Sequence, residues 1–167
     1  MRLPRLACID NQGLNFIGDW HGILHLPQYD PYALLYRHII GLTALIRRRM
    51  VDEIGGYDPQ FRYYEDWEFW LRALRYGWRG RRVDAVTVEY RKHGSSKWSA
   101  DRTRYRRTFA HLQERHADLY ARAPELATQS DLGPLRRLAY RRLWGPRPWP
   151  PILESVAYRL LWRRPAR

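Results

Sequence analysis

Two adjacent carboxylates, Glu65 and Asp66, stand where a tyrosine-rich loop gives way to a strongly helical pattern. A carboxylate in the first turn of a helix lies at the positive end of the helix dipole, which keeps it ionised. It also projects from the end of an element, so it can combine a fixed position with the free lone pair that a general base needs. The simpler alternative is that Asp66 is the N-cap of the helix, and the local pattern by itself favours that reading.

Aromatic side chains adjoin this carboxylate pair in the sequence. Tyr64 and Trp67 flank it, and aromatic rings of this kind could stack on the apolar face of a sugar. Trp20 and His21, in an upstream loop, could line the same site or could equally be buried loop anchors. These aromatic side chains are therefore compatible with a sugar bound beside Asp66.

The elements that must position these groups follow from hydrophobic periodicity. An apolar stripe predicts a helix over residues 66–76 that ends at Gly77, with Glu68, Arg72 and Arg75 on its other side. A continuous apolar run predicts a buried strand over 39–46, and alternation predicts a half-buried strand over 83–91. Further predictions are two short strands around a turn at 10–13, one or two helical turns before Gly55, and helices at 33–38, 102–122, 134–144 and 152–162. Strand–helix–strand order indicates the α/β class.

The composition is strongly basic, with 30 lysines and arginines against 17 acidic residues and a net charge of +13. Arginine provides nearly all of the positive charge, and its planar fork suits phosphates and carboxylates. The excess concentrates in residues 134–167, which carry nine basic side chains and one acidic side chain. Acidic partners follow from this: a sugar nucleotide, an anionic membrane face or a nucleic acid.

Several protein classes are disfavoured by simple counts. One cysteine excludes an internal disulfide framework and a thiolate zinc cage. The N-terminal residues contain no apolar stretch of the kind that would predict a signal peptide. The longest apolar run is far shorter than the ~20 residues of a membrane span. We therefore expect a cytoplasmic protein, with peripheral contact at the inner face of the membrane through 134–167 as an option. Nucleic acid is the less favoured partner, because no helix-turn-helix, ribonucleoprotein or zinc-finger signature accompanies the arginines.

Three motifs follow one another in the order found in family-2 glycosyltransferases, and together they resemble that family over about residues 9–98. The resemblance is carried by Ile9–Gly13, by the series Ile46–Arg48, Gly55–Asp58 and Glu65–Arg72, and by Tyr90–Ser96. It implies a GT-A fold, here a partial Rossmann-like sheet with flanking helices and a basic helical tail. It also implies inverting transfer from a nucleotide sugar to a carbohydrate or lipid-linked acceptor, as in cell-wall or polysaccharide biosynthesis.

The same resemblance assigns roles to individual residues. Asp66 would take the proton from the acceptor hydroxyl, and Glu65 would shape the field around it. A divalent metal, Mg²⁺ or Mn²⁺, would neutralise the departing diphosphate. His93 matches the place of a histidine that reaches this metal in some relatives, and the alternative for His93 is an ordinary exposed loop histidine.

The chain departs from the family at its donor half, because no Asp-x-Asp motif for the metal occurs in it. Residues 1–100 would be the C-terminal half of the catalytic domain, 101–144 a helical extension, and 145–167 a proline-containing linker with a basic amphipathic tail. We therefore expect a truncated or partial enzyme that binds a sugar nucleotide poorly by itself. The alternative is a non-catalytic basic module that binds nucleic acid or an anionic membrane surface.

Overall fold

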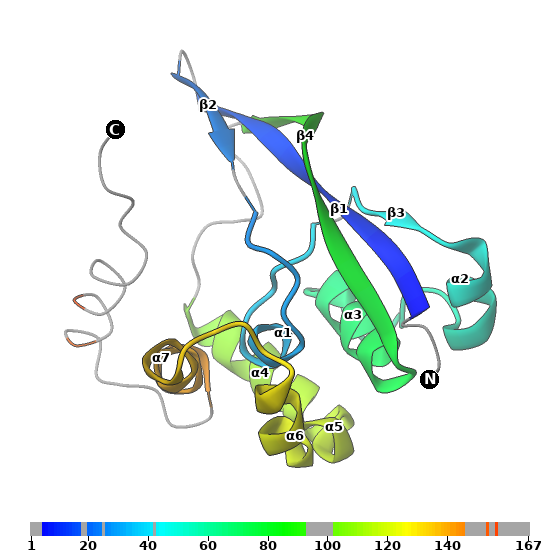
Figure 1. The fold of residues 1–167 in the computed structure, drawn as a ribbon, viewed down its shortest axis with the longest axis vertical. Coiled ribbons are helices and arrows are strands. Elements are labelled where there is room, and N and C mark those ends of the chain that lie inside the picture. The colour runs from blue at the N-terminus through cyan, green and yellow to red at the C-terminus, as the bar shows by residue number, and fades with distance from the viewer. Residues whose placement is uncertain are drawn as a thin grey trace.

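The structure is a computed structural model that describes residues 5–17, 20–24, 26–41, 43–92 and 102–145, together with 153 and 156. Side chains are described for 26–41, 43–85, 106–143, 145, 153 and 156. The chain mixes helices and strands, as expected at the coarse level of an α/β protein (Figure 1). The statements below refer to these residues.

One long strand organises the sheet. The strand β1 (Arg5–Ile17) pairs in parallel with β4 (Trp78–Lys92) along one edge. Along its other edge it pairs antiparallel with β2 (Trp20–Leu24) and with the short β3 (Leu45–Ile46). Figure 1 shows β1 and β4 running side by side as a long two-stranded ribbon.

Seven helices complete the described part of the chain, and most lie to one side of this ribbon (Figure 1). Helix α3 packs against α1, α2 and β4, whereas α1 also packs against α6 and α7. The helices are α1 (Pro31–Tyr36), α2 (Arg48–Ile54), α3 (Glu65–Arg75), α4 (Arg102–Arg115), α5 (Ala117–Ala121), α6 (Ala123–Thr128) and α7 (Pro134–Trp144).

Helix α3 was predicted closely from the sequence. Three acidic residues in its first turn and two arginines in its last turn complement the helix dipole. Its apolar stripe is buried, with Trp67 and Leu71 fully inaccessible. The helix ends before Gly77, which has a φ of 82° that favours glycine. The helix prediction over 66–76 is therefore confirmed to within one residue at each end.

One hydrophobic core joins the first and second halves of the described chain. Phe109, Leu112 and Leu119, from the helices after residue 101, belong to the same buried cluster as Trp67 and Leu35. The helices that follow β4 therefore close over α1 and α3 and bury their apolar faces.

Several sequence predictions need correction. The strand expected over 39–46 is formed only at Leu45–Ile46, while Ile39 and Ile40 are buried in the core without strand pairing. A short apolar run says that a segment is buried but not which backbone conformation it takes.

The N-terminal prediction is wrong in a different way, because 5–17 is a single strand rather than two strands around a turn. The parallel partner β4 holds it extended, and the predicted turn survives only as register shifts around Gln12.

The helix expected over 102–122 is divided, since α4 ends at Arg115 and α5 begins at Ala117. The helices at α1, α2 and α7 are found where they were expected, and Gly55 ends α2 with a φ of 81°. The helix expected over 152–162 lies outside the described residues except for Leu153 and Val156, which are helical. In the described part of the chain, no helix has the length and apolar character needed to cross a bilayer.

Candidate functional site

Asp66 is the second residue of α3 and is nearly enclosed. The N-cap position belongs to Tyr64, which has a φ of 59° and makes no side-chain capping bond, so Asp66 is not the N-cap. Its Oδ1 accepts a hydrogen bond of 2.8 Å from the backbone N–H of Trp67. Its Oδ2 lies 3.1 Å from Nε2 of His38, and only 7% of the residue is exposed. The carboxylate is thus more enclosed, and more occupied by protein groups, than the free general base that the sequence suggested.

His38 is the partner that the sequence analysis missed. It follows α1, and its ring stacks on Trp67 and stands edge-on to Tyr64, with both centroid distances at 6.4 Å. Its Nε2 lies close to Asp66 without being aligned for a hydrogen bond, so the contact is electrostatic. A lone histidine after a short helix carries no local signal, which is why only the fold brings it to this carboxylate. An imidazole in this position can hold or pass a proton.

Tyr57 adds an exposed aromatic ring to the same neighbourhood. It is 48% exposed, and its ring packs on Phe69 at a centroid distance of 5.2 Å. Partial burial and the negative charges of Asp66 and Glu65 raise the pKa of the Tyr57 hydroxyl. The position of Tyr57 in the Gly55–Asp58 motif was the one available sequence signal for it.

The predicted sugar-stacking role of Trp67 is wrong, because its ring is buried. Trp67 is fully buried, its Nε1 donates a 2.7 Å hydrogen bond to the carbonyl of Leu34, and its ring packs on Phe109. No face of this indole is available to a ligand. Trp67 belongs to the apolar stripe of α3, which faces the core. Tyr64 is half-buried and lies edge-on to Trp67, with its centroid 5.9 Å away.

The side chains of three other predicted site residues are not described. Trp20 and His21 lie in the strand β2, where the sequence predicted a loop, because they pair with β1, and their side chains are outside the described part of the structure. His93 lies outside the described residues altogether. Among the residues whose side chains are described, no three histidine, cysteine or acidic groups come together as a metal site. The divalent metal, which was expected mainly through the missing Asp-x-Asp motif with His93 as a further ligand, stays a prediction.

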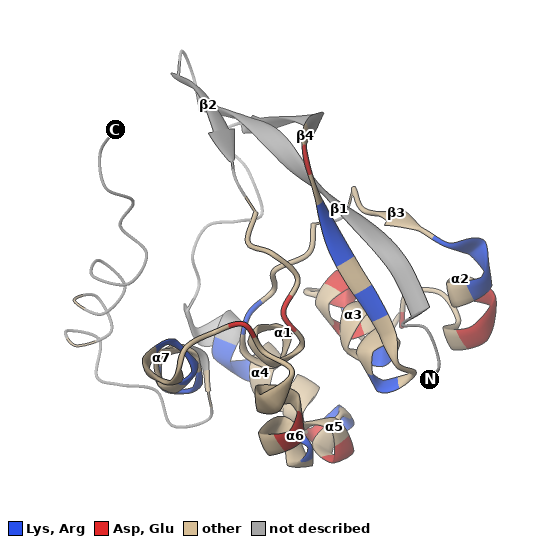
Figure 2. Ribbon diagram, viewed as in Figure 1, with Lys and Arg blue, Asp and Glu red and all other residues tan. Residues whose placement is uncertain are grey.

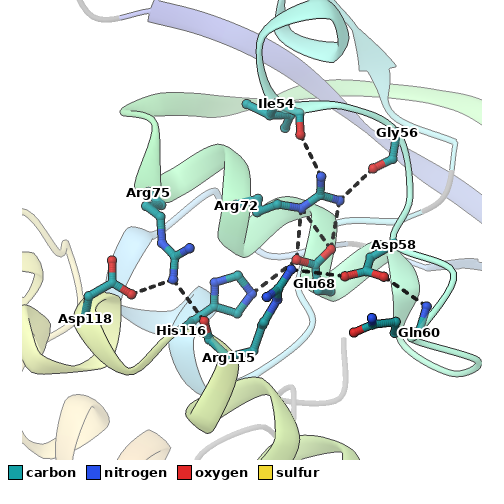
Figure 3. Close-up of polar contacts among 10 residues, drawn as sticks. All are labelled: Ile54, Gly56, Asp58, Gln60, Glu68, Arg72, Arg75, Arg115, His116 and Asp118. Carbon is teal, nitrogen blue, oxygen red and sulfur yellow. Dashed lines mark hydrogen bonds and ion pairs between the residues drawn. The ribbon is translucent and has the colours of Figure 1, made fainter.

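A buried ion pair fixes the loop before α3. Glu68 is fully buried, which corrects its expected place on the solvent side of the helix, although the predicted pair with Arg72 is present. Arg72 donates from Nε and Nη2 to the Glu68 carboxylate at 2.8–3.0 Å (Figure 3). The same guanidinium donates to the carbonyls of Ile54 and Gly56, each at 2.7 Å. Arg72 therefore holds the Gly55–Asp58 segment, and with it Tyr57, against α3.

His116 closes this network from the break between α4 and α5. It is fully buried, and its Nε2 lies 3.3 Å from Oε1 of Glu68, although the ring N–H is not aligned for a hydrogen bond (Figure 3). Burial raises the pKa of the Glu68 carboxyl, but its contacts with His116 and Arg72 outweigh burial and hold that pKa below the ordinary value. Glu68 is therefore an ionised carboxylate that stabilises the fold, and it is fully buried where Asp66 keeps 7% of its surface exposed.

Comparisons with family models, with curated proteins and with solved structures find no match for this chain.

Proposed function

We propose that this chain is the acceptor-side part of an inverting, nucleotide-sugar-dependent glycosyltransferase. The observation that carries the proposal is the group on α3 in which Asp66 contacts His38, while the exposed Tyr57 packs on Phe69 of the same helix. The motifs Gly55–Asp58 and Glu65–Arg72, on which the resemblance to family-2 glycosyltransferases depends, are joined in space by Arg72.

In this proposal Asp66 takes the proton from the acceptor hydroxyl, whose oxygen attacks the anomeric carbon as the nucleoside diphosphate leaves on the opposite side. The bond from Asp66 Oδ1 to the Trp67 N–H fixes the carboxylate, so Oδ2 is the atom left for proton transfer. His38 beside Oδ2 accepts or shares that proton, and Glu65 adds negative charge at the same helix end.

The acceptor approaches from the side of Tyr57. This ring is exposed where Trp67 is not, so it takes over the stacking role that the sequence assigned to the tryptophan. A divalent metal, Mg²⁺ or Mn²⁺, would assist diphosphate departure mainly through groups of the donor half, and the nucleotide sugar would bind chiefly there.

The test supplies a donor-binding half, in cis or in trans, and measures sugar transfer to an acceptor. Asp66→Asn keeps an oxygen for the Trp67 N–H and removes the base, so transfer should fall by about a hundredfold or more while folding is retained. Asp131→Asn, at an exposed position in the loop before α7, is the matched control and should leave transfer unchanged. Full transfer by the folded Asp66→Asn variant would contradict the proposal.

A further inference from the structure

The outer face of α7 combines exposed leucines with arginines. Leu135 is 79% exposed and Leu138 is 46% exposed, whereas Ala139, Tyr140 and Leu143 on the opposite face are buried. The helix is therefore anchored to the domain through one side. The other side, named here the α7 face, consists of Leu135, Leu138, Arg141 and Arg142.

The charges of the α7 face are uncompensated within the described structure. Helix α7 contains no acidic residue, and Figure 2 shows lysine and arginine colouring without acidic colouring along it. Arg137 is engaged, because its Nη1 donates to the carbonyl of Ala127 at 2.8 Å. Arg141 and Arg142 are exposed and make no ion pair with any residue that the structure describes. Two exposed cationic side chains thus follow two exposed leucines along one side of an anchored helix.

We propose that the α7 face binds the surface of an anionic lipid bilayer. Leucines inserted at the level of the headgroups remove apolar area from water, while arginines beside them bind lipid phosphates, and the long arginine stems permit both at once. Leu153 and Val156, which are three residues apart, helical and about half exposed, are a further pair of exposed apolar side chains after α7. This inference does not depend on the proposed chemistry at Asp66.

Two other occupants fit the α7 face less well. A nucleic acid would neutralise the arginines but would leave Leu135 and Leu138 in water, since phosphate contacts need no apolar surface. A second copy of the chain, joined through the same patch on both subunits, would bring Arg141 and Arg142 against like charges. The anionic bilayer is the one partner that complements both the charge and the apolar area.

The experiment is co-sedimentation of the full chain with vesicles of phosphatidylcholine alone or mixed with phosphatidylglycerol. The chain should bind the anionic vesicles, bind the neutral ones weakly and dissociate as salt rises. The double substitution Arg141→Gln with Arg142→Gln should weaken binding about 30-fold, since each arginine near an anionic surface contributes about fivefold. Leu135→Ser with Leu138→Ser should weaken it at least about tenfold.

Matched controls lie on other parts of the molecule. Arg48→Gln with Arg49→Gln removes the same charge from the exposed face of α2, and Leu45→Ser removes a leucine that is 66% exposed on β3. Both should leave vesicle affinity within about threefold. All of these positions are exposed, so the variants should keep the thermal stability of the parent chain.

Three results would overturn the inference. The first is equal binding to neutral and anionic vesicles. The second is indifference to the leucine pair together with tight, salt-sensitive binding to a polynucleotide, which would assign the arginines to nucleic acid. The third is a stable dimer in light scattering that the Leu135→Ser and Leu138→Ser pair abolishes, which would assign the α7 face to a second copy.

Discussion

Removal of the Arg72 guanidinium tests how the loop before α3 is held. Arg72→Ala deletes the countercharge of Glu68, which is fully buried, and removes the donors to the carbonyls of Ile54 and Gly56. Breaking a buried ion pair from one side costs about 3–5 kcal/mol, because the remaining charge stays desolvated. For a chain of this length, that cost lowers the melting temperature by about 6–20 °C.

The assay is urea unfolding followed by the fluorescence of the buried tryptophans, with the free energy of unfolding extrapolated to water. Arg75→Ala is the matched control, since Arg75 pairs with Asp118, which is 62% exposed, and such a pair contributes about 0–1 kcal/mol. Replacing both partners, Glu68→Leu with Arg72→Met, should recover most of the loss, because no charge is then left buried.

The reasoning is refuted if Arg72→Ala costs no more than Arg75→Ala. It is also refuted if the Glu68→Leu and Arg72→Met pair is as unstable as Arg72→Ala alone. A large loss of stability in Arg72→Ala would also bear on function, because the loop that Arg72 holds carries Tyr57. Under the proposed function, a conservative Arg72→Lys change should therefore weaken acceptor binding while leaving the chain folded.

Three further changes test separate contacts. The pKa of the Glu68 carboxyl is held below its ordinary value of 4.5. The ionised carboxylate therefore stabilises the fold above pH 4.5, and this stabilisation is lost as the pH falls through the lowered pKa. Urea unfolding at a series of pH values should show that Glu68→Gln lacks this loss of stability in acid. Trp67→Phe removes a buried hydrogen bond to Leu34 and part of a core ring, and should cost about 2–4 kcal/mol of unfolding free energy. Gly80→Ala would place a Cβ 2.7 Å from Cδ2 of Tyr29 and should cost about 1–3 kcal/mol, read as a lower urea midpoint.

Each of these three predictions has an outcome that would contradict it. An unchanged acid profile in Glu68→Gln would mean that other carboxylates control the loss of stability at low pH. A Trp67→Phe variant as stable as the parent would contradict the buried hydrogen bond. Gly133→Ala is the control for Gly80→Ala, because nothing lies within 4 Å of a Cβ placed there. Equal stability of the two alanine variants would remove the steric argument.

Local patterns predicted α3 because its determinants are local. The apolar stripe, the acidic first turn and Gly77 are all within the helix or next to it, so the sequence is sufficient to define the element. The burial of Glu68 was missed for the opposite reason, since it depends on His116, which reaches Glu68 only when α4 and α5 pack over α3. A charged residue is assigned to the surface by default, and only a tertiary partner reverses that assignment.

The difference between local and tertiary determinants also explains the errors in the strand predictions. The apolar character of 39–46 was interpreted correctly as burial, but pairing with β1 reaches only Leu45 and Ile46. The N-terminal turn was expected from local turn chemistry, whereas the long parallel partner β4 keeps β1 extended with irregular register there. In both cases the extent of strand pairing, which is non-local, decided the outcome.

The candidate site shows why a position in the first turn of α3 constrains a general base. Asp66 gains a fixed orientation because Trp67, the next residue, is anchored in the core and presents its N–H to Oδ1. The carboxylate is also nearly enclosed, and its other oxygen, Oδ2, lies beside His38. Under the proposed function, a base in this position depends on its neighbours for proton transfer. His38 and Tyr57 are therefore the residues whose substitution should alter the pH dependence and the acceptor affinity of transfer while leaving the core of α3 intact.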